Sequence, residues 1–222
     1  MAGARGHYER AFEHHLRDGG IPYVSVDDAR RALLPERASL RVTETDPSDP
    51  AETRSRALKS FDFVVYGGAS NLLVDIKGRK IGRKAAETAA TAKRPPKVGR
   101  LESWVTLDDI DSLRAWERLF GGGFSAAFVF VYWCVERPPG ELFQEIIEHQ
   151  GRWYAVRGVS LSDYCSAMKV RSPRWRTVDL RTADFDRLSR PFTARFGPVE
   201  PITGDLMDQT TDRLLETLDQ CV

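Results

Sequence analysis

The chain has 222 residues and a formal net charge of +1 at neutral pH, and 41% of its residues are hydrophobic. This is enough apolar material for a globular core, and the near-neutral charge excludes a uniformly basic nucleic-acid-binding surface. The three cysteines, Cys134, Cys165 and Cys221, lack the spacing of a zinc ribbon and argue against a disulfide framework. The N-terminus lacks the apolar segment of a signal peptide, and the longest apolar run, 124–135, is too short to span a bilayer. We therefore expect a cytoplasmic protein without a membrane contact.

Before residue 55 the sequence predicts two helices, one strand and an insertion. Apolar residues at helical spacing predict a helix over 8–17, which a pair of glycines ends. A short strand over 21–26 follows, and an aspartate pair then begins a helical segment that runs through Leu34. Residues 35–55 are polar and contain prolines, so they predict a flexible loop or insertion.

The most informative stretch is a pair of apolar, β-branched runs, 60–67 and 72–78, joined by a turn of small residues, which predicts a β-hairpin. The first run carries Asp62, and the second carries Asp75 with Lys77 two residues later. Because side chains at i and i+2 of a strand point to the same face, Asp75 and Lys77 share one face. Burying two acids and a lysine is costly unless they pair or bind a metal, so this pattern indicates a functional site.

The remainder of the chain alternates helical and extended patterns. A helix is predicted over 107–120, with Thr106 or Asp108 as its cap, and a buried strand over 124–135 follows it. The other expected segments, in chain order, are a basic loop with a helical patch over 80–99, a strand over 152–157, a short helix over 161–168, an extended aromatic-basic segment over 171–180 and an amphipathic helix over 210–218.

This order of elements resembles the PD-(D/E)xK nuclease superfamily, and within it the archaeal Holliday-junction resolvases. The resemblance rests on Glu9 in the first helix, on Asp62 between two phenylalanines, and on Asp75-Ile76-Lys77, which fits the (D/E)xK signature with Asp in place of the more frequent Glu. Glu13 lies one turn from Glu9 on the same helix face, so it stays an alternative for the helix acid.

The resemblance implies an α/β, restriction-endonuclease-like core over 6–136, with a central mixed β-sheet flanked by helices and a flexible insertion over 35–55. An irregular C-terminal extension over 137–222 is expected to pack on this core. The sequence is also similar to an uncharacterised planctomycete-type family of such proteins. The matching stretches are 21–24, 59–65, 102–106 and 170–175.

The same resemblance implies four catalytic residues: Glu9, Asp62, Asp75 and Lys77. Asp62, Asp75 and the backbone carbonyl of Ile76 are expected to bind Mg²⁺, or Mn²⁺ in its place, because hard oxygen ligands suit these ions. The metal would polarise a phosphate and lower the pKa of a bound water. Lys77 would orient that water or stabilise developing charge, and Glu9 would act through water or as an accessory base.

Basic and aromatic residues near this stretch are candidates for nucleic-acid contact. The first set is Arg79, Lys80, Trp104 and Thr106, with core packing or helix capping as the alternative for Trp104 and Thr106. A second set mixes aromatic and guanidinium groups as a nucleic-acid surface does, with a packed lid over the core as the alternative: Arg171, Arg174, Trp175 and Arg176.

The leading functional hypothesis is a metal-dependent endonuclease that cleaves DNA, branched or structured DNA included, with DNA favoured over RNA as the partner. Since resolvases of this fold act as symmetric dimers, the resemblance allows a homodimer. The alternative is a non-catalytic nucleic-acid-binding or protein-assembly module that keeps the nuclease fold. A third reading gives the C-terminal half a protein-interaction role.

Overall fold

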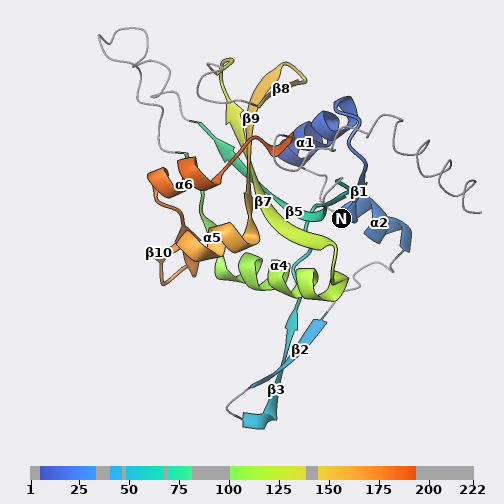
Figure 1. Ribbon diagram of the computed structural model, residues 1–222, viewed down its shortest axis with the longest axis vertical. Helices are drawn as coiled ribbons and strands as arrows, with labels where there is room; N and C mark the ends of the chain where they lie inside the picture. Colours follow the sequence, from blue (N-terminus) through green and yellow to red (C-terminus); the bar gives the residue numbers. More distant parts are fainter. Residues whose placement is uncertain are drawn as a thin grey trace, which may run out of the picture.

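A computed structural model describes residues 6–33, 41–46, 49–67, 70–81, 101–138 and 145–193. Its centre is a six-stranded sheet with the order β1-β4-β5-β7-β9-β8 (Figure 1). The strands are, in sheet order, β1 (Tyr23–Ser25), β4 (Phe63–Val65), β5 (Asn71–Lys80), β7 (Phe124–Cys134), β9 (Arg152–Ser160) and β8 (Ile146–His149). Only β5 and β7 are parallel, and the other neighbours are antiparallel. The predicted α/β class with a central mixed sheet is confirmed.

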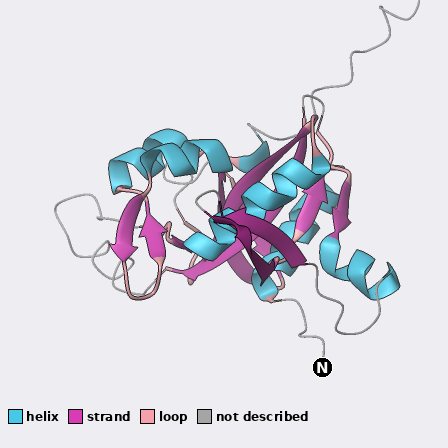
Figure 2. Cartoon of the chain, turned by 90° about the horizontal axis from the view of Figure 1, so that it is seen from below, coloured by secondary structure: helices cyan, strands magenta, loops and turns pink. Residues whose placement is uncertain are grey.

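Helices cover both faces of this sheet, as the view from below shows (Figure 2). On one face α1 (His7–Asp18) buries Phe12 and Leu16 against even-numbered residues of β5 and odd-numbered residues of β7. On the other face lie α4 (Leu107–Phe120), α5 (Leu161–Ala167) and α6 (Thr182–Leu188). Because strand side chains alternate between faces, one sheet supplies two separate cores. The remaining helix, α2 (Val26–Leu33), follows β1.

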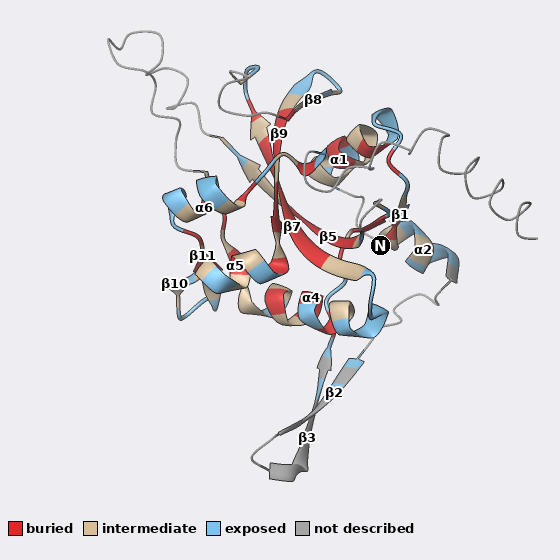
Figure 3. Cartoon of the chain, viewed as in Figure 1, coloured by how far each residue is buried: buried red, intermediate tan, exposed pale blue. Residues whose placement is uncertain are grey.

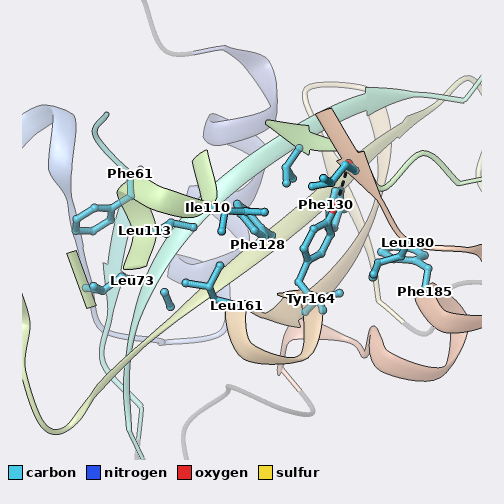
Figure 4. Close-up of a cluster of buried hydrophobic side chains, with 14 of the residues drawn as sticks. Phe61, Leu73, Ile110, Leu113, Phe128, Phe130, Leu161, Tyr164, Leu180 and Phe185 are labelled. Atoms are coloured by element: carbon cyan, nitrogen blue, oxygen red, sulfur yellow. Dashed lines mark hydrogen bonds between the residues drawn. The ribbon is translucent and has the colours of Figure 1, made fainter. Parts of the chain in front are cut away.

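The core beneath α4, α5 and α6 combines aliphatic side chains with a group of aromatic rings (Figure 4). Phe128 and Phe130 of β7 are fully buried there, and Tyr164 of α5 packs against both rings. The Tyr164 hydroxyl lies 2.7 Å from the Ser103 carbonyl oxygen and 3.2 Å from that of Val178, and it donates to these acceptors. Such pairing satisfies a buried hydroxyl. None of the helices in the described ranges combines the length and apolar character needed to cross a membrane.

The insertion expected at 35–55 is a further hairpin where it is described. β2 (Arg41–Asp46) and β3 (Asp49–Ala57) pair antiparallel and extend away from the rest of the molecule (Figure 1). The loop prediction is therefore wrong for these residues. A two-stranded ladder satisfies its backbone hydrogen bonds without a buried side-chain face, so a polar composition does not prevent it.

The central sheet continues past the core boundary predicted at residue 136. β9 pairs with β7 along Ala127–Cys134, and β8 pairs with β9 at the sheet edge. The strand predicted over 152–157 is confirmed as β9 and is longer than expected. Together β8 and β9 add two strands to the central sheet from the part of the chain assigned to an extension. Residues 82–100 and 194–222, with the helical patch and the tail helix expected there, lie outside the described residues.

A second, three-stranded sheet has the order β10-β11-β6. β10 (Lys169–Ser172) and β11 (Thr177–Asp179) form a hairpin within the segment predicted to be extended. β11 then pairs with β6 (Val105–Thr106), the two residues that lead into α4. Chain positions about 70 residues apart are thus joined at the start of that helix.

Helix α1 contacts β5 closely at Gly78. A Cβ atom added to this glycine would overlap the ring of Tyr8. The absence of a side chain at this position therefore lets α1 lie directly on the strand that carries Asp75 and Lys77, with Tyr8 next to Glu9 on the same helix.

We expect Gly78→Ala to lower the free energy of unfolding by about 1–3 kcal/mol, the usual cost of overpacking a tight contact. Urea denaturation followed by circular dichroism measures it. Gly122→Ala is the matched control, because a Cβ there meets no atom within 4 Å. A loss of stability at Gly122 equal to that at Gly78 would contradict the packing of α1 on β5.

Candidate active site

Strand β5 places Asp75 and Lys77 on one face, as the sequence predicts, and this face meets α4. The Lys77 ammonium nitrogen lies 2.9 Å from Asp75 Oδ2 and 3.2 Å from Oδ2 of Asp109, which belongs to α4. All three side chains are between 12% and 15% exposed. A buried ammonium is thus held between two carboxylates from two different elements.

Asp109 is the residue of this cluster that sequence reasoning missed. It is the third residue of α4, where its carboxylate accepts the Thr106 backbone N–H (2.9 Å) and its own N–H donates to the Thr106 hydroxyl (3.1 Å). The helix predicted over 107–120 is confirmed, and this capping box identifies Thr106 as its cap. Lys59 donates to Asp109 Oδ1 at 2.9 Å. The Thr-x-x-Asp pattern signals a helix start, but only tertiary packing connects it to Lys77.

Asp62 reaches β5 through its own hydrogen bonds. Its backbone N–H donates to the Val74 carbonyl (2.9 Å), and its carboxylate Oδ2 accepts the Ile76 N–H (2.6 Å). The side chain thereby continues the ladder between β4 and β5 beyond the first residue of β4. This geometry fixes the Asp62 carboxylate beside the segment of β5 that carries Asp75.

The two strand carboxylates are held in an environment that disfavours their charge. Burial raises the pKa of Asp62 to about 7, and the negative charge of Asp75 contributes to the same shift. Burial also raises the pKa of Asp75, against the opposing charge of Lys77. Asp109 behaves differently: burial alone would raise its pKa, but Lys77 and the hydrogen bonds from Thr106 and Lys59 lower it to about 2.

Lys77 itself stays charged in this cluster. Burial acts to lower its pKa, but the charges of Asp75 and Asp109 outweigh burial, and the net pKa is raised. The positive charge of Lys77 is therefore compensated by two carboxylates, while the raised pKa values of Asp62 and Asp75 show that their negative charges are compensated less well.

Of the two glutamates proposed for the first helix, Glu9 is the one whose charge reaches the cluster. Its negative charge contributes to the raised pKa of Asp62, and its Oε2 is buried without a hydrogen-bond partner. Glu13 instead accepts hydrogen bonds from Arg17 and from the Tyr23 hydroxyl, each at 2.8 Å. Glu9 therefore stays the predicted helix acid, although α1 packs on the face of the sheet opposite to Asp75 and Lys77.

The donor atoms of this cluster suit a hard cation. Asp62, Asp75 and the Ile76 carbonyl present oxygen ligands, and a cation there would relieve the repulsion that raises the pKa of Asp62. The described part of the chain contains no group of three or more His, Cys, Asp or Glu side chains placed to hold a metal. The metal ligands therefore remain a prediction from the sequence, resting on two carboxylates and one backbone carbonyl.

The four predicted nucleic-acid contacts fall on both faces of the sheet. Arg79 shares the face of Asp75 and Lys77, and its guanidinium lies 4.1 Å from the centre of the Trp104 ring and donates to the Trp104 carbonyl at 2.5 Å. Lys80 points to the opposite face, 4.3 Å from the Trp133 ring. Thr106 caps α4. Of these four residues, Arg79 and Trp104 therefore form a cationic-aromatic pair on the face of the cluster.

No known protein family matches the chain, and no curated protein matches it either. Among solved structures it is similar to Hjc, a Holliday junction resolvase from the archaeal hyperthermophile Archaeoglobus fulgidus. The TM-score is 0.43 and the sequence identity is 12%, over 86% of this chain and 94% of that chain. The residues of the chain itself therefore carry the function proposed below.

The raised pKa of Asp62 predicts a pH-dependent gain of stability in Asp62→Asn. Between pH 4 and pH 7 the unfolded parent loses this proton while the folded parent keeps it, so the free energy of unfolding of the parent falls as the pH rises. The stability of the asparagine variant does not fall in this way, because its side chain does not titrate, and its side-chain oxygen can still accept the Ile76 N–H. In EDTA we expect its stability relative to the parent to rise between pH 5 and pH 8, by on the order of 1–3 kcal/mol.

Urea denaturation at both pH values measures this difference. Asp28→Asn serves as the control, because that side chain is 59% exposed and its ion-pair partner is an arginine, Arg31. An advantage of Asp62→Asn that is equal at pH 5 and pH 8 would show that Asp62 titrates normally.

Proposed function

We propose that this chain is a divalent-metal-dependent endonuclease that hydrolyses phosphodiester bonds in DNA. The observation that carries the proposal is a pair of carboxylates, the half-buried Asp62 just before β4 and the buried Asp75 of the neighbouring β5, with the Lys77 ammonium 2.9 Å from Asp75. Raised pKa values at catalytic-type residues are a recognised feature of functional sites. Asp62, Asp75 and Lys77 are also residues on which the resemblance of the sequence to PD-(D/E)xK nucleases rests.

In this proposal Asp62, Asp75 and the Ile76 carbonyl hold Mg²⁺, with Mn²⁺ as a substitute. When bound, the metal supplies a Lewis acid that polarises the scissile phosphate and lowers the pKa of water. Lys77 directs positive charge at the phosphate oxygens, where negative charge develops during hydrolysis. Asp109 and Asp75 fix the position of that ammonium, and the unpaired buried oxygen of Glu9 accepts a hydrogen bond from water.

The partner in this proposal is DNA, with branched or structured DNA as the preferred form, and the protein acts in the cytoplasm. A homodimer, the arrangement that the resolvase resemblance allows, belongs to the same proposal. Light scattering measures the oligomeric state, and the panel of DNA substrates described below measures the preferred form of DNA.

A second candidate function is a nucleic-acid-binding module without catalysis. The observation that favours it is the position of Lys77 between Asp75 and Asp109, because a lysine paired with two carboxylates also serves as a structural ion-pair network. Cleavage and metal binding separate the two candidates.

The proposal predicts that Asp75→Asn and Lys77→Ala reduce cleavage by about 100-fold or more, the usual cost of removing a group that stabilises developing charge. The measurement is cleavage of plasmid, linear duplex, single-stranded and four-way-junction DNA in Mg²⁺ and in Mn²⁺. Asp18→Asn is the matched control and keeps the parent rate. Equal cleavage by the parent and by both variants would show that these residues are not the catalytic site.

Metal binding can be measured without activity. We expect millimolar Mg²⁺ to raise the free energy of unfolding of the parent by about 1 kcal/mol at pH 8, because a ligand that binds only the folded state stabilises it by mass action. Asp75→Asn should lose this gain, and Lys77→Ala should keep it. A melting temperature of the parent that does not change with Mg²⁺, together with no cleavage, would favour the non-catalytic module.

A further inference from the structure

The β10–β11 hairpin presents an exposed indole at its turn, outside the cluster already described. Trp175 is 69% exposed, and the turn that carries it is among the exposed parts of the surface in Figure 3. The turn has a defined geometry: the Arg176 N–H donates to the Pro173 carbonyl at 3.2 Å, and Arg176 adopts φ of 48°, which non-glycine residues rarely take. This exposure excludes the packed lid that was the alternative for the segment.

The hairpin is attached to the candidate active site through backbone pairing. Thr177 of β11 pairs with Thr106 of β6, and the Leu107 N–H donates to the Arg176 carbonyl at 2.9 Å. Thr106 is the residue whose hydroxyl and backbone N–H are bound to Asp109, the second partner of Lys77. The exposed turn is therefore built onto the same helix start that positions the buried ammonium.

A tryptophan forms a second connection between the hairpin and β5. The guanidinium of Arg79 lies 4.1 Å from the centre of the Trp104 ring, and that of Arg171, in β10, lies 5.2 Å from the same centre. Glu102 lies 3.9 Å from both arginines. The side chains of Arg79, Trp104 and Arg171 thus form a row that runs from the face of Lys77 to the hairpin.

The charge of the hairpin indicates the chemistry of its occupant. The hairpin contains one acidic residue, Asp179, and four cations that surround Trp175 in the sequence: Lys169, Arg171, Arg174 and Arg176. Arg176 is paired with Asp108 at 3.4 Å, whereas Arg174 lies 5.3 Å from the Trp175 ring and forms no ion pair with another described residue. An excess of cations around a flat, exposed aromatic ring complements phosphates alternating with bases.

We propose that the β10–β11 hairpin binds an unpaired strand of nucleic acid beside the active site, with Trp175 stacked on a base and Arg174 in contact with a phosphate. This rests on the proposed function and gives that site its substrate class: DNA with a single-stranded segment next to the cleaved bond. The base faces of a continuous duplex are covered by neighbouring bases, so an indole can stack fully only where a base is unpaired or terminal.

The test measures binding without cleavage. In the Asp75→Asn background and in EDTA, fluorescence anisotropy compares three labelled DNAs of equal length: a blunt duplex, a duplex with a single-stranded arm, and a single strand. We expect Trp175→Ala to weaken binding of the armed duplex and the single strand by about tenfold, the usual effect of losing one stacked base. Binding of the blunt duplex should change less than twofold. Trp175→Phe should restore part of the loss.

Salt dependence separates the two side chains. Arg174→Ala should reduce the slope of log affinity against log salt by about 0.7 on the single strand, the value for one lost phosphate contact, while Trp175→Ala leaves the slope unchanged. Leu119→Ala and Arg187→Ala are the controls, because these side chains are 65% and 63% exposed. Both should bind every DNA as the background does.

Two outcomes would overturn the proposal: binding by Trp175→Ala equal to the background on all three DNAs, or an equal loss on the blunt duplex. The cleavage panel is a separate readout. If the parent cleaves DNA and Trp175→Ala binds normally, the nuclease proposal stands and the hairpin proposal is wrong. If the parent cleaves no DNA and Trp175→Ala loses single-strand binding, the hairpin proposal stands and the nuclease proposal is wrong.

Discussion

The arrangement of the site depends on one buried ammonium group held between two elements. Lys77 of β5 lies between Asp75 of the same strand and Asp109 of α4. Removing charges from water is costly, and well-packed apolar residues in place of a buried ion pair are often neutral or stabilising. The stability of the fold therefore does not by itself explain this cluster. Its geometric effect is clear: the ion pairs fix the register of the start of α4 against β5, and the β6–β11 pairing is attached to that same helix start.

The carboxylates of the cluster differ in how well their charges are compensated. Asp109 accepts hydrogen bonds from Thr106 and Lys59 as well as the charge of Lys77, and its pKa falls to about 2. Burial, together with the negative charges of Asp75 and Glu9, raises the pKa of Asp62 to about 7 against the one backbone N–H that it receives. Compensation is therefore concentrated on the α4 side of Lys77, while the side toward α1 keeps an excess of negative charge. A cation that binds here would complete the charge balance that the protein side chains leave open.

Local patterns in the sequence were sufficient for much of this structure. The alternation of side chains along β5 placed Asp75 and Lys77 on one face, and the helical spacing of 107–120 gave α4 its observed bounds. Features that depend on contacts between distant segments could not be found in this way. The contact between Asp109 and Lys77 requires the packing of α4 on β5, and the pairing of β9 with β7 leaves no local signal that distinguishes a core strand from an extension. The β2–β3 hairpin was missed because its polar sequence lacks the apolar alternation by which strands are recognised.

The second sheet changes how the C-terminal half of the chain relates to the site. A segment that merely covered the core would bury its apolar side chains, yet Val170 and Trp175 are each 69% exposed, while Val178, the β11 partner of Val170, is buried. The hairpin therefore uses one side chain to anchor itself in the core and leaves its turn free for contact. Because β11 pairs with the two residues before α4, the turn lies next to Thr106 in the fold, and the hydrogen bonds of Thr106 hold Asp109. The exposed turn and the Asp109 partner of Lys77 are therefore both attached to the start of α4.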